Sequence, residues 1–414
     1  MKKQRPEALS IKQNMLWNSA GSLVNLGCQW LISIFIVRLA SDYRAAGVYS
    51  LALSISSMLG PIAHFRTYTY QVSDVDDEFK ASDYLVFRLM TCSAALLVTA
   101  LYSIVTVDSS SLVAILLLSV WKLIGFVIDV FHATDQKNHR MDFIGKSLAL
   151  QGAVSLGLFC LVFGLSDSLE LALIAMALGT MTICVAFDYP RARLFADFKQ
   201  GTNAAKMRSL FLACLPLVVA NVAFSAVPSI PRQLLSTLNG ASDLGIYASV
   251  AAPAAIIQAG AAYIYNPLIG YFSSYKKNGE SRNFVTLFSK AICGVFLIGV
   301  AATIVLGLFG DLLLTIMYGA DIARYSYLFY LIVPVSILIG VAGFMNDLLM
   351  ALRFSKEVSI SSYLSLIVTA IVSVPFIEQF GLNGVSLACL VSEGVGIAYS
   401  AVVIWRKVLR VETR

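Results

Sequence analysis

The sequence predicts an all-α polytopic membrane protein with about twelve transmembrane helices in two six-helix bundles. Hydrophobic residues make up 58% of its 414 residues and charged residues only 13%, whereas soluble domains carry about 25% charged residues. The apolar residues also form long continuous runs, and a helix needs about 20 such residues to cross a bilayer. A membrane β-barrel would instead show short segments of alternating polarity, so the runs indicate helices.

The apolar runs form six predicted spans on each side of a longer polar segment. We expect the first six at 14–39, 47–70, 83–107, 111–133, 146–165 and 169–189. We expect the second six at 209–236, 244–270, 285–309, 326–351, 358–377 and 382–405. The first run is too long for the apolar core of a cleaved signal peptide, so we expect it to be retained.

The polar segment DYPRARLFADFKQGTNAAKMRS separates two predicted halves, residues 1–200 and 201–414. A short repeat supports this division, because SD followed by AAGVYSLA at Ser41 is matched by SD followed by LGIYASVA at Ser242. Both copies fall in the first outer turn of their half. Transporters are often built from two repeated halves with the substrate path at their interface, and we expect that arrangement here.

The distribution of lysine and arginine predicts the orientation of the chain. With the N-terminus in the cytoplasm, the cytoplasmic segments hold 24 of the 30 Lys and Arg residues. The outer turns and their edges hold only Arg38, Arg44 and Arg324. Positive residues are retained on the cytoplasmic side of a membrane, and one miscounted helix would reverse every later loop. The bias therefore predicts an even number of spans with both termini in the cytoplasm.

Polar side chains recur every three or four residues along one face of the first span. They are Asn14, Asn18, Ser22, Asn25, Gln29 and Ser33. The seventh span repeats this pattern with Asn221, Ser225, Ser229, Arg232 and Ser236. A polar face is costly against lipid, so the two faces predict a central, water-accessible cavity lined by both spans. The alternative is that these groups only hold helices together, which suits Arg232 poorly.

A few ionisable residues fall inside the predicted spans, where each is a functional candidate by default. Lys122 lies near the middle of the fourth span, and Asp129 follows seven residues later on the same face. Asp347 lies late in the tenth span and Glu393 near the middle of the twelfth. We expect the three acidic residues to couple transport to an ion. The alternative is that they form buried ion pairs, and Lys122 with Asp129 is one possible pair.

The predicted cavity lining favours an anionic ligand that carries hydroxyl groups. Arg232 and Lys122 suit a phosphate or a carboxylate, whereas amide and hydroxyl side chains suit the hydroxyls of a sugar. The predicted substrate-binding residues of this second kind are Gln29, Asn25, Asn18, Asn221 and Ser225. Together the two kinds indicate a phosphate-bearing glycan rather than a hydrophobic drug.

The sequence carries no pattern that is typical of a catalytic, metal or cofactor site. It has no GxxxxGK[ST], HExxH or GxSxG motif, and its seven cysteines form no CxxC pair. The three histidines do not have the spacing of a metal site, and the basic residues do not line one face as in nucleic-acid binding. We therefore expect a transporter and not an enzyme, without a cofactor and without a nucleic-acid partner, driven by an ion or substrate gradient.

Three segments carry a resemblance to a known family. They are NMLWNSAGSLVNLGCQWLISIFIVRL with the following AGVYSLALSIS, LLLTIMYGADIARYSYLFYLI, and FGLNGVSLACLVSEGVGIAYS. Over essentially the whole chain, the sequence resembles the polysaccharide or O-antigen repeat-unit flippases (Wzx-type) of the multidrug/oligosaccharidyl-lipid/polysaccharide (MOP) exporter superfamily. Glu393 falls on the acidic position that often follows the last glycine-rich turn in such sequences. The first outer turn, SDYRAAGVY, departs from the LGPEEYG-like form that is usual in the family.

The resemblance implies alternating access and export of an undecaprenyl-diphosphate-linked oligosaccharide to the outer leaflet of the bacterial cytoplasmic membrane. The implied partners are this lipid-linked substrate, membrane lipids, and the polysaccharide polymerase and export machinery. Two other functions stay open. One is a multidrug or metabolite cation antiporter of the same superfamily, in which Asp129 or Asp347 would meet the cation. The other is a membrane-embedded glycan polymerase or acyltransferase.

Overall fold

The computed structural model describes residues 6–74, 78–199 and 201–409, without the side chains at 213, 216, 217 and 409. The chain divides into two compact units, unit 1 (Met1–Val218) and unit 2 (Val219–Arg414). The division falls within one long helix, α9 (Ala204–Asn239). The predicted boundary between the halves, at residues 200 and 201, stays a prediction.

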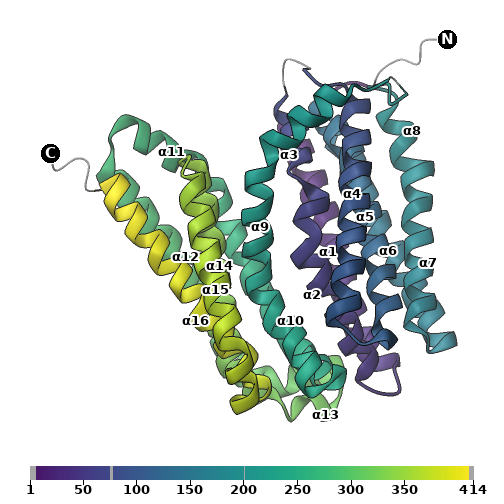
Figure 1. Cartoon of the computed structure of the whole chain (residues 1–414), viewed down its shortest axis with the longest axis vertical. Coiled ribbons are helices and arrows are strands. Elements are labelled where there is room, and N and C mark those ends of the chain that lie inside the picture. Colours follow the sequence, from purple (N-terminus) through teal and green to yellow (C-terminus); the bar gives the residue numbers. More distant parts are fainter. Residues whose placement is uncertain (1–5, 75–77, 200, 410–414) are drawn as a thin grey trace. The chain divides into compact units, whose positions relative to one another are not determined.

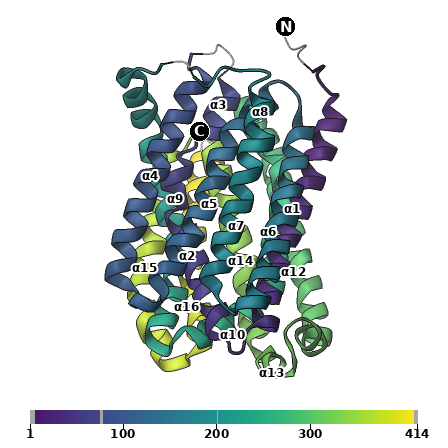
Figure 2. The ribbon, with the colours of Figure 1, turned by 90° about the vertical axis from the view of Figure 1, so that its right-hand side faces the viewer.

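Unit 1 is a bundle of long helices, coloured purple to teal in Figure 1. Before α9 it contains α1 (Ile11–Leu39), α2 (Arg44–His64), α3 (Thr67–Ser73), α4 (Ala81–Thr106), α5 (Ser109–Lys137), α6 (Met141–Ser166), α7 (Leu169–Ile183), the π-helical η1 (Cys184–Asp188) and α8 (Tyr189–Ala192). Helix α5 is central, because it contacts α2, α4 and α7, while α1 packs along α6. Figure 2 shows α5, α6 and α7 side by side.

Unit 2 is a second helical bundle. After α9 it contains α10 (Ala241–Tyr265), η2 (Asn266–Leu268), α11 (Ile269–Asn278), α12 (Ser281–Tyr318), α13 (Ala320–Ala323), η3 (Ser326–Leu328), α14 (Phe329–Ala351), α15 (Ser355–Phe380), α16 (Leu382–Ile404) and η4 (Trp405–Leu409). Helix α14 contacts α10, α12 and α16, and α15 packs along α16.

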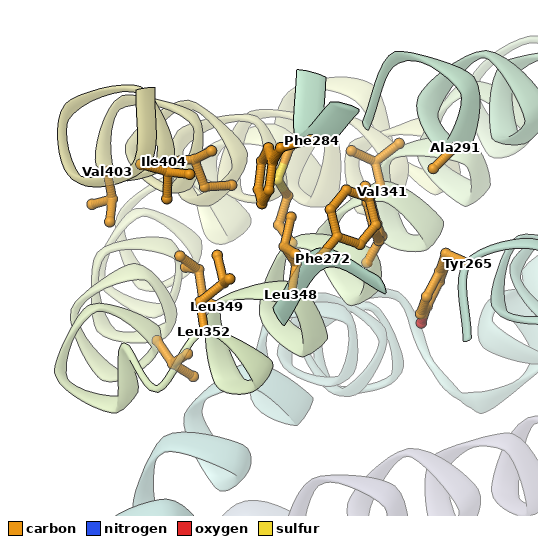
Figure 3. Close-up of a cluster of buried hydrophobic side chains, with 14 of the residues drawn as sticks. Tyr265, Phe272, Phe284, Ala291, Val341, Leu348, Leu349, Leu352, Val403 and Ile404 are labelled. Carbon is orange, nitrogen blue, oxygen red and sulfur yellow. The ribbon is translucent and has the colours of Figure 1, made fainter. Parts of the chain in front are cut away.

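An aromatic core holds the short helix α11 in unit 2 (Figure 3). Phe272 of α11 is fully buried, and its ring centroid lies 5.0 Å from that of Phe284 and 5.8 Å from that of Phe344. These rings connect α11 to α12 and α14, and Val403 and Ile404 of α16 belong to the same buried cluster. The core therefore ties one end of the bundle together by apolar burial.

Eleven helical segments of the described residues are long and apolar enough to cross a membrane. Each overlaps one predicted span. The predicted and observed ends differ most for the span 285–309, because the observed helix α12 is longer at both ends. The remaining predicted span, 209–236, lies within α9, a continuous helix some of whose side chains lie outside the description. The predicted class, an all-α polytopic membrane protein, is confirmed. The cytoplasmic placement of the termini stays a prediction.

The second predicted span, 47–70, is broken rather than continuous. Phe65 and Arg66 adopt left-handed backbone conformations, with φ of 41° and 52°, between α2 and α3. This conformation costs a non-glycine residue roughly 1–2 kcal/mol. The side chain of Arg88 offsets the cost, because its Nη1 donates to the carbonyls of Ala63 at 2.5 Å and His64 at 2.6 Å. These bonds satisfy carbonyls that the broken helix leaves without partners.

Helices α1 and α6 cross with their backbones in contact. A Cβ added to Gly21 would lie 2.1 Å from the carbonyl oxygen of Gly145, and one added to Gly145 would lie 2.1 Å from that of Trp17. Further along, a Cβ on Gly152 would lie 2.8 Å from the Cα of Asn25. Glycine permits such close helix contacts in membranes, and this crossing fixes the rotation of the polar face of α1.

Candidate functional site

The structure brings two of the predicted substrate-binding residues together. Lys122 Nζ of α5 donates a hydrogen bond to Gln29 Oε1 of α1 at 2.9 Å, and both side chains are half-buried. The ammonium also lies 4.5 Å from the centroid of the neighbouring Trp121 ring. Within the described ranges, Lys122 forms no ion pair with a carboxylate. Its positive charge is therefore not neutralised by a partner in unit 1.

The polar face of α1 is used in two ways. Asn14 at the start of the helix is buried and structural, since its amide donates to the carbonyl of Leu9 at 3.0 Å and accepts from the backbone N–H of Met141 at 2.8 Å. Asn18 and Asn25 are half-buried, and no hydrogen bond joins either side chain to another described residue. The role of Asn18 and Asn25 as substrate contacts stays a prediction.

Asp129 does not form the possible ion pair with Lys122. Its electrostatic partners are His132, on the same helix, and Arg88 of α4. Arg88 is fully buried, and its Nε and Nη2 have no hydrogen-bond partner among the described residues. Arg88 is therefore part of a polar network inside unit 1.

In unit 2, Arg232 is half-buried on α9. It interacts electrostatically with Tyr247 of α10 and Cys389 of α16. No hydrogen bond or ion pair connects it to another residue in the described ranges. Asn221 and Ser225 are also half-buried on α9, and the carbonyl of Ser225 accepts the hydroxyl of Ser229 at 2.7 Å. The predicted cavity between the first and seventh spans stays a prediction.

Glu393 lies at a small polar cavity in unit 2. It is only 2% exposed, and no ion pair is formed by it within the described part of the chain. The cavity offers about 20 Å³ to the centre of a water molecule, which is room for one water or one dehydrated cation. Its polar lining consists of Asn346, Ser361, Ser362, Ser365, Glu393 and Ser400. Such a set of oxygen atoms suits a proton or a small hard cation.

The hydroxyls of this cavity are held in place by helix contacts. Ser361 Oγ donates to the carbonyl of Gly396 at 3.0 Å and lies 3.1 Å from Ser400 Oγ. Asp347, the other predicted acidic residue of unit 2, is not part of the lining. The hydroxyl of Tyr265 hydrogen-bonds to it, which joins α14 to α10. Glu393 therefore faces this cavity and Asp347 does not.

Sequence reasoning missed a buried group of ionisable side chains in unit 1. His132 and Asp135 of α5 and Asp188 of η1 are all at most 3% exposed. His132 Nε2 lies 3.3 Å from Asp188 Oδ1. One signal was present in the sequence, since Asp129, His132 and Asp135 follow one another at intervals of three and so share a side of one helix. Asp188, however, is distant in sequence.

Comparison with known proteins places the fold. No family model matches the chain. The capsular polysaccharide biosynthesis protein CapF of Staphylococcus aureus is 24% identical over 390 residues, which cover 93% of this chain and 97% of that protein. The lipid II flippase MurJ, in an inward closed conformation, is 10% identical with a TM-score of 0.71, over 94% of this chain and 87% of that one.

A third similarity is to a multidrug resistance MATE family transporter of the MOP superfamily, in an inward-facing conformation. It is 12% identical with a TM-score of 0.67, over 93% of this chain and 98% of that one. The fold that the resemblance to the MOP superfamily implied is thereby confirmed, and the fold similarity extends over nearly the whole chain. The solved structures that share this fold are a flippase and a transporter.

Proposed function

We propose, from the shared MOP fold, that this protein is a flippase for an undecaprenyl-diphosphate-linked oligosaccharide. It would move the repeat unit of a capsule or O-antigen polysaccharide from the cytoplasmic to the outer leaflet of a bacterial cytoplasmic membrane. The observation that carries the proposal is the similarity to CapF over almost the full length of both chains, because CapF is named for capsular polysaccharide biosynthesis. The fold similarity to a lipid II flippase supports the same substrate class.

The two cations without carboxylate partners support a diphosphate-bearing substrate. Lys122 and Arg232 are each half-buried, and neither forms an ion pair within the described ranges. A partly desolvated cation gains most from an anion that brings its own hydrogen-bond acceptors. We propose that the diphosphate meets these residues and that Asn18, Asn25 and Gln29 meet the sugar hydroxyls. The remaining proposed contacts on α9 are Asn221 and Ser225.

The energy for transport is proposed to come from an ion gradient. Glu393 supports this, since it is a buried carboxylate at a cavity with room for one small cation or water. Asp129 and Asp347 are proposed as further acidic groups of the coupling path. An ion drives alternating access only if it binds one conformation more tightly than the other. A buried carboxylate between helices meets that requirement, because helix movement changes its surroundings.

Complementation of a strain that lacks its flippase tests the substrate contacts. We expect Lys122→Gln and Arg232→Gln to reduce surface polysaccharide strongly and to leave lipid-linked repeat units in the cytoplasmic leaflet. The control is Arg324→Gln, since Arg324 is highly exposed and pairs with the equally accessible Asp321 one helical turn earlier. Full activity of both cavity variants at equal protein levels would contradict the proposal. The proposed partners, a polysaccharide polymerase and its export machinery, must be present in that strain.

The second candidate function, a multidrug or metabolite cation antiporter, is favoured by the fold similarity to a MATE transporter. Drug susceptibility of a deletion strain separates the two functions. A flippase predicts unchanged drug susceptibility together with loss of surface polysaccharide. An antiporter predicts the reverse pattern.

A further inference from the structure

A buried acidic and imidazole group lies at one end of unit 1, apart from the residues proposed above for the substrate. His132 and Asp135 occupy the last turns of α5, and Asp188 ends the η1 segment. Their exposed fractions are 3%, 1% and 1%. His132 Nε2 and Asp188 Oδ1 lie 3.3 Å apart, so an imidazole and a carboxylate are paired away from solvent.

The backbone around Asp188 is unusual. Helix α7 continues into five π-helical residues, Cys184–Asp188, before α8 begins at Tyr189. A π-helical turn is rare because its hydrogen bonds are less favourable than those of an α-helix, and it is often found at functional sites. Here the π-helical turn ends on the side chain that meets His132.

The carboxylate oxygens of this group lack donors. Both oxygens of Asp135 and Oδ2 of Asp188 are buried and have no hydrogen-bond partner among the described residues. Buried polar atoms are nearly always paired. An ionised carboxylate without any donor is strongly disfavoured in such a place, and a buried group of this kind becomes neutral instead.

The cations around Asp135 are engaged elsewhere. The guanidinium of Arg140 binds both oxygens of Asp142, at 2.8 and 3.0 Å, and Lys146 also pairs with Asp142. The ammonium of Lys137, on α5 itself, donates to the carbonyl of Asp74 at 2.6 Å. Asp135 thus has acidic neighbours that it repels and basic neighbours bound to other groups.

Among the described residues, the remaining elements around the group supply no hydrogen-bond donor to either oxygen of Asp135. Arg88 of α4 donates to the carbonyls of the α2 break, and its charge acts on Asp129. From α3, the amide of Gln71 donates to the carbonyl of Val130 and to the Thr134 hydroxyl, and the Tyr68 hydroxyl bonds to Gln136. The acidic Asp129 lies on the same helix.

We propose that His132, Asp135 and Asp188 form a buried proton-binding site in unit 1. The group contains two carboxyls and one imidazole, so a protonated His132 can balance only one carboxylate. A further proton on Asp135 makes the group neutral and removes the unpaired charge. No group of three or more His, Cys, Asp or Glu side chains in the described part of the chain is arranged to hold a metal ion, which favours a proton as the occupant.

This proposal is separate from the ion site at Glu393 and from the identity of the transported substrate. The competing explanation is that His132 and Asp188 only pack η1 against α5. Packing alone requires no protonated aspartate at neutral pH. A measurement that detects the proton directly therefore distinguishes the two explanations, whereas loss of stability in a variant would not.

The test is infrared spectroscopy of the full-length protein in lipid nanodiscs, with ¹³C in the side-chain carboxyls of aspartate. We expect the carbonyl band of a protonated aspartic acid at neutral pH, and we expect it to disappear in alkaline solution. Asp135→Asn should remove one carboxyl from this band. The matched control is Asp142→Asn, because Asp142 is also buried but is paired with Arg140 and Lys146. A band that is the same in Asp135→Asn as in the wild type would overturn the proposal.

A second measurement keeps His132, Asp135 and Asp188 unchanged. It therefore tests the proposal even if Asp135→Asn does not fold. The chain has three histidines, and His64→Gln with His139→Gln leaves His132 as the only one. Its imidazole signals in nuclear magnetic resonance should change over the same pH range as the protonated-aspartate band. No protonated aspartate at neutral pH, or an imidazole that does not respond while the band titrates, would overturn the proposal.

Discussion

Gly145 of α6 lies directly against Trp17 of α1, so that a Cβ on the glycine would fall 2.1 Å from the tryptophan carbonyl oxygen. The neighbour is backbone, which cannot move aside as a flexible side chain does. We expect Gly145→Ala to separate the two helices and to lower the free energy of unfolding by roughly 1–3 kcal/mol, the usual cost of overpacking. Thermal unfolding in detergent measures this.

Gly157 of the same helix provides the control. A Cβ there would meet nothing within 4 Å, and alanine favours a helix over glycine by roughly 0.5–1 kcal/mol. Gly157→Ala should therefore leave the unfolding temperature unchanged or raise it. Equal unfolding temperatures for Gly145→Ala and Gly157→Ala would contradict the close crossing.

Arg88 is predicted to hold the break between α2 and α3. Arg88→Gln removes the guanidinium that accounts for the hydrogen bonds to Ala63 and His64. The carbonyl of Ala63 keeps a second donor, the Thr91 hydroxyl at 2.9 Å, so the carbonyl of His64 loses most. A buried carbonyl left without a donor costs on the order of 1–3 kcal/mol. We expect faster hydrogen exchange in α3 and a lower unfolding temperature. Arg44→Gln is the comparison, because Arg44 is exposed at the start of α2, and similar exchange in both variants would count against this role.

Glu393 is predicted to be needed for gradient-driven transport but not for folding. Glu393→Gln keeps the size and polarity of the side chain and removes its ability to ionise. The measurement is transport of a lipid-linked substrate in proteoliposomes. An ion gradient should stimulate this transport in the wild type and should have little effect in the variant. Glu378→Gln, on the exposed face of α15, should retain the stimulation. Undiminished stimulation in Glu393→Gln would remove Glu393 from the coupling path.

Asp74, just after α3, is predicted to make the free energy of unfolding decrease at acidic pH. Burial raises the pKa of its carboxyl, but hydrogen bonds from the Phe79 N–H, the Tyr84 hydroxyl and the Glu78 N–H outweigh burial and bring the pKa below its ordinary value. A carboxyl whose pKa is lowered by folding stabilises the protein above its unfolded pKa, about 3.9. That contribution is lost as the pH falls through the folded pKa.

The variant Asp74→Asn tests this sign. At neutral pH it should unfold at a lower temperature than the wild type, and the two should converge as the pH falls from the unfolded pKa through the lower folded pKa. Asp321→Asn serves as the control, because Asp321 is highly exposed beside Arg324. A difference between Asp74→Asn and the wild type that persists unchanged into acid would mean that the charge of Asp74 is not responsible.

Hydropathy predicted the spans well because membrane insertion depends on the local run of apolar residues. The polar face of the first span was likewise expected to meet protein or water, and Gln29 contacts Lys122. The break at Phe65 and Arg66 was not predicted, since neither is glycine and the conformation is stabilised by Arg88 on another helix. The pairing of His132 with Asp188 also joins distant segments. Such contacts are properties of the folded chain and not of any local pattern.

The contact between α1 and α6 also sets an order of events during synthesis. Asn14 accepts its hydrogen bond from Met141, which is 127 residues later in the chain. At about 5–20 residues per second, the ribosome needs roughly 6–25 s to reach that position. During this interval the side-chain oxygen of Asn14 lacks its native donor, and the close glycine contact of α1 with α6 cannot form. The first helix of the chain therefore reaches its native packing only after the first five helices have been synthesised.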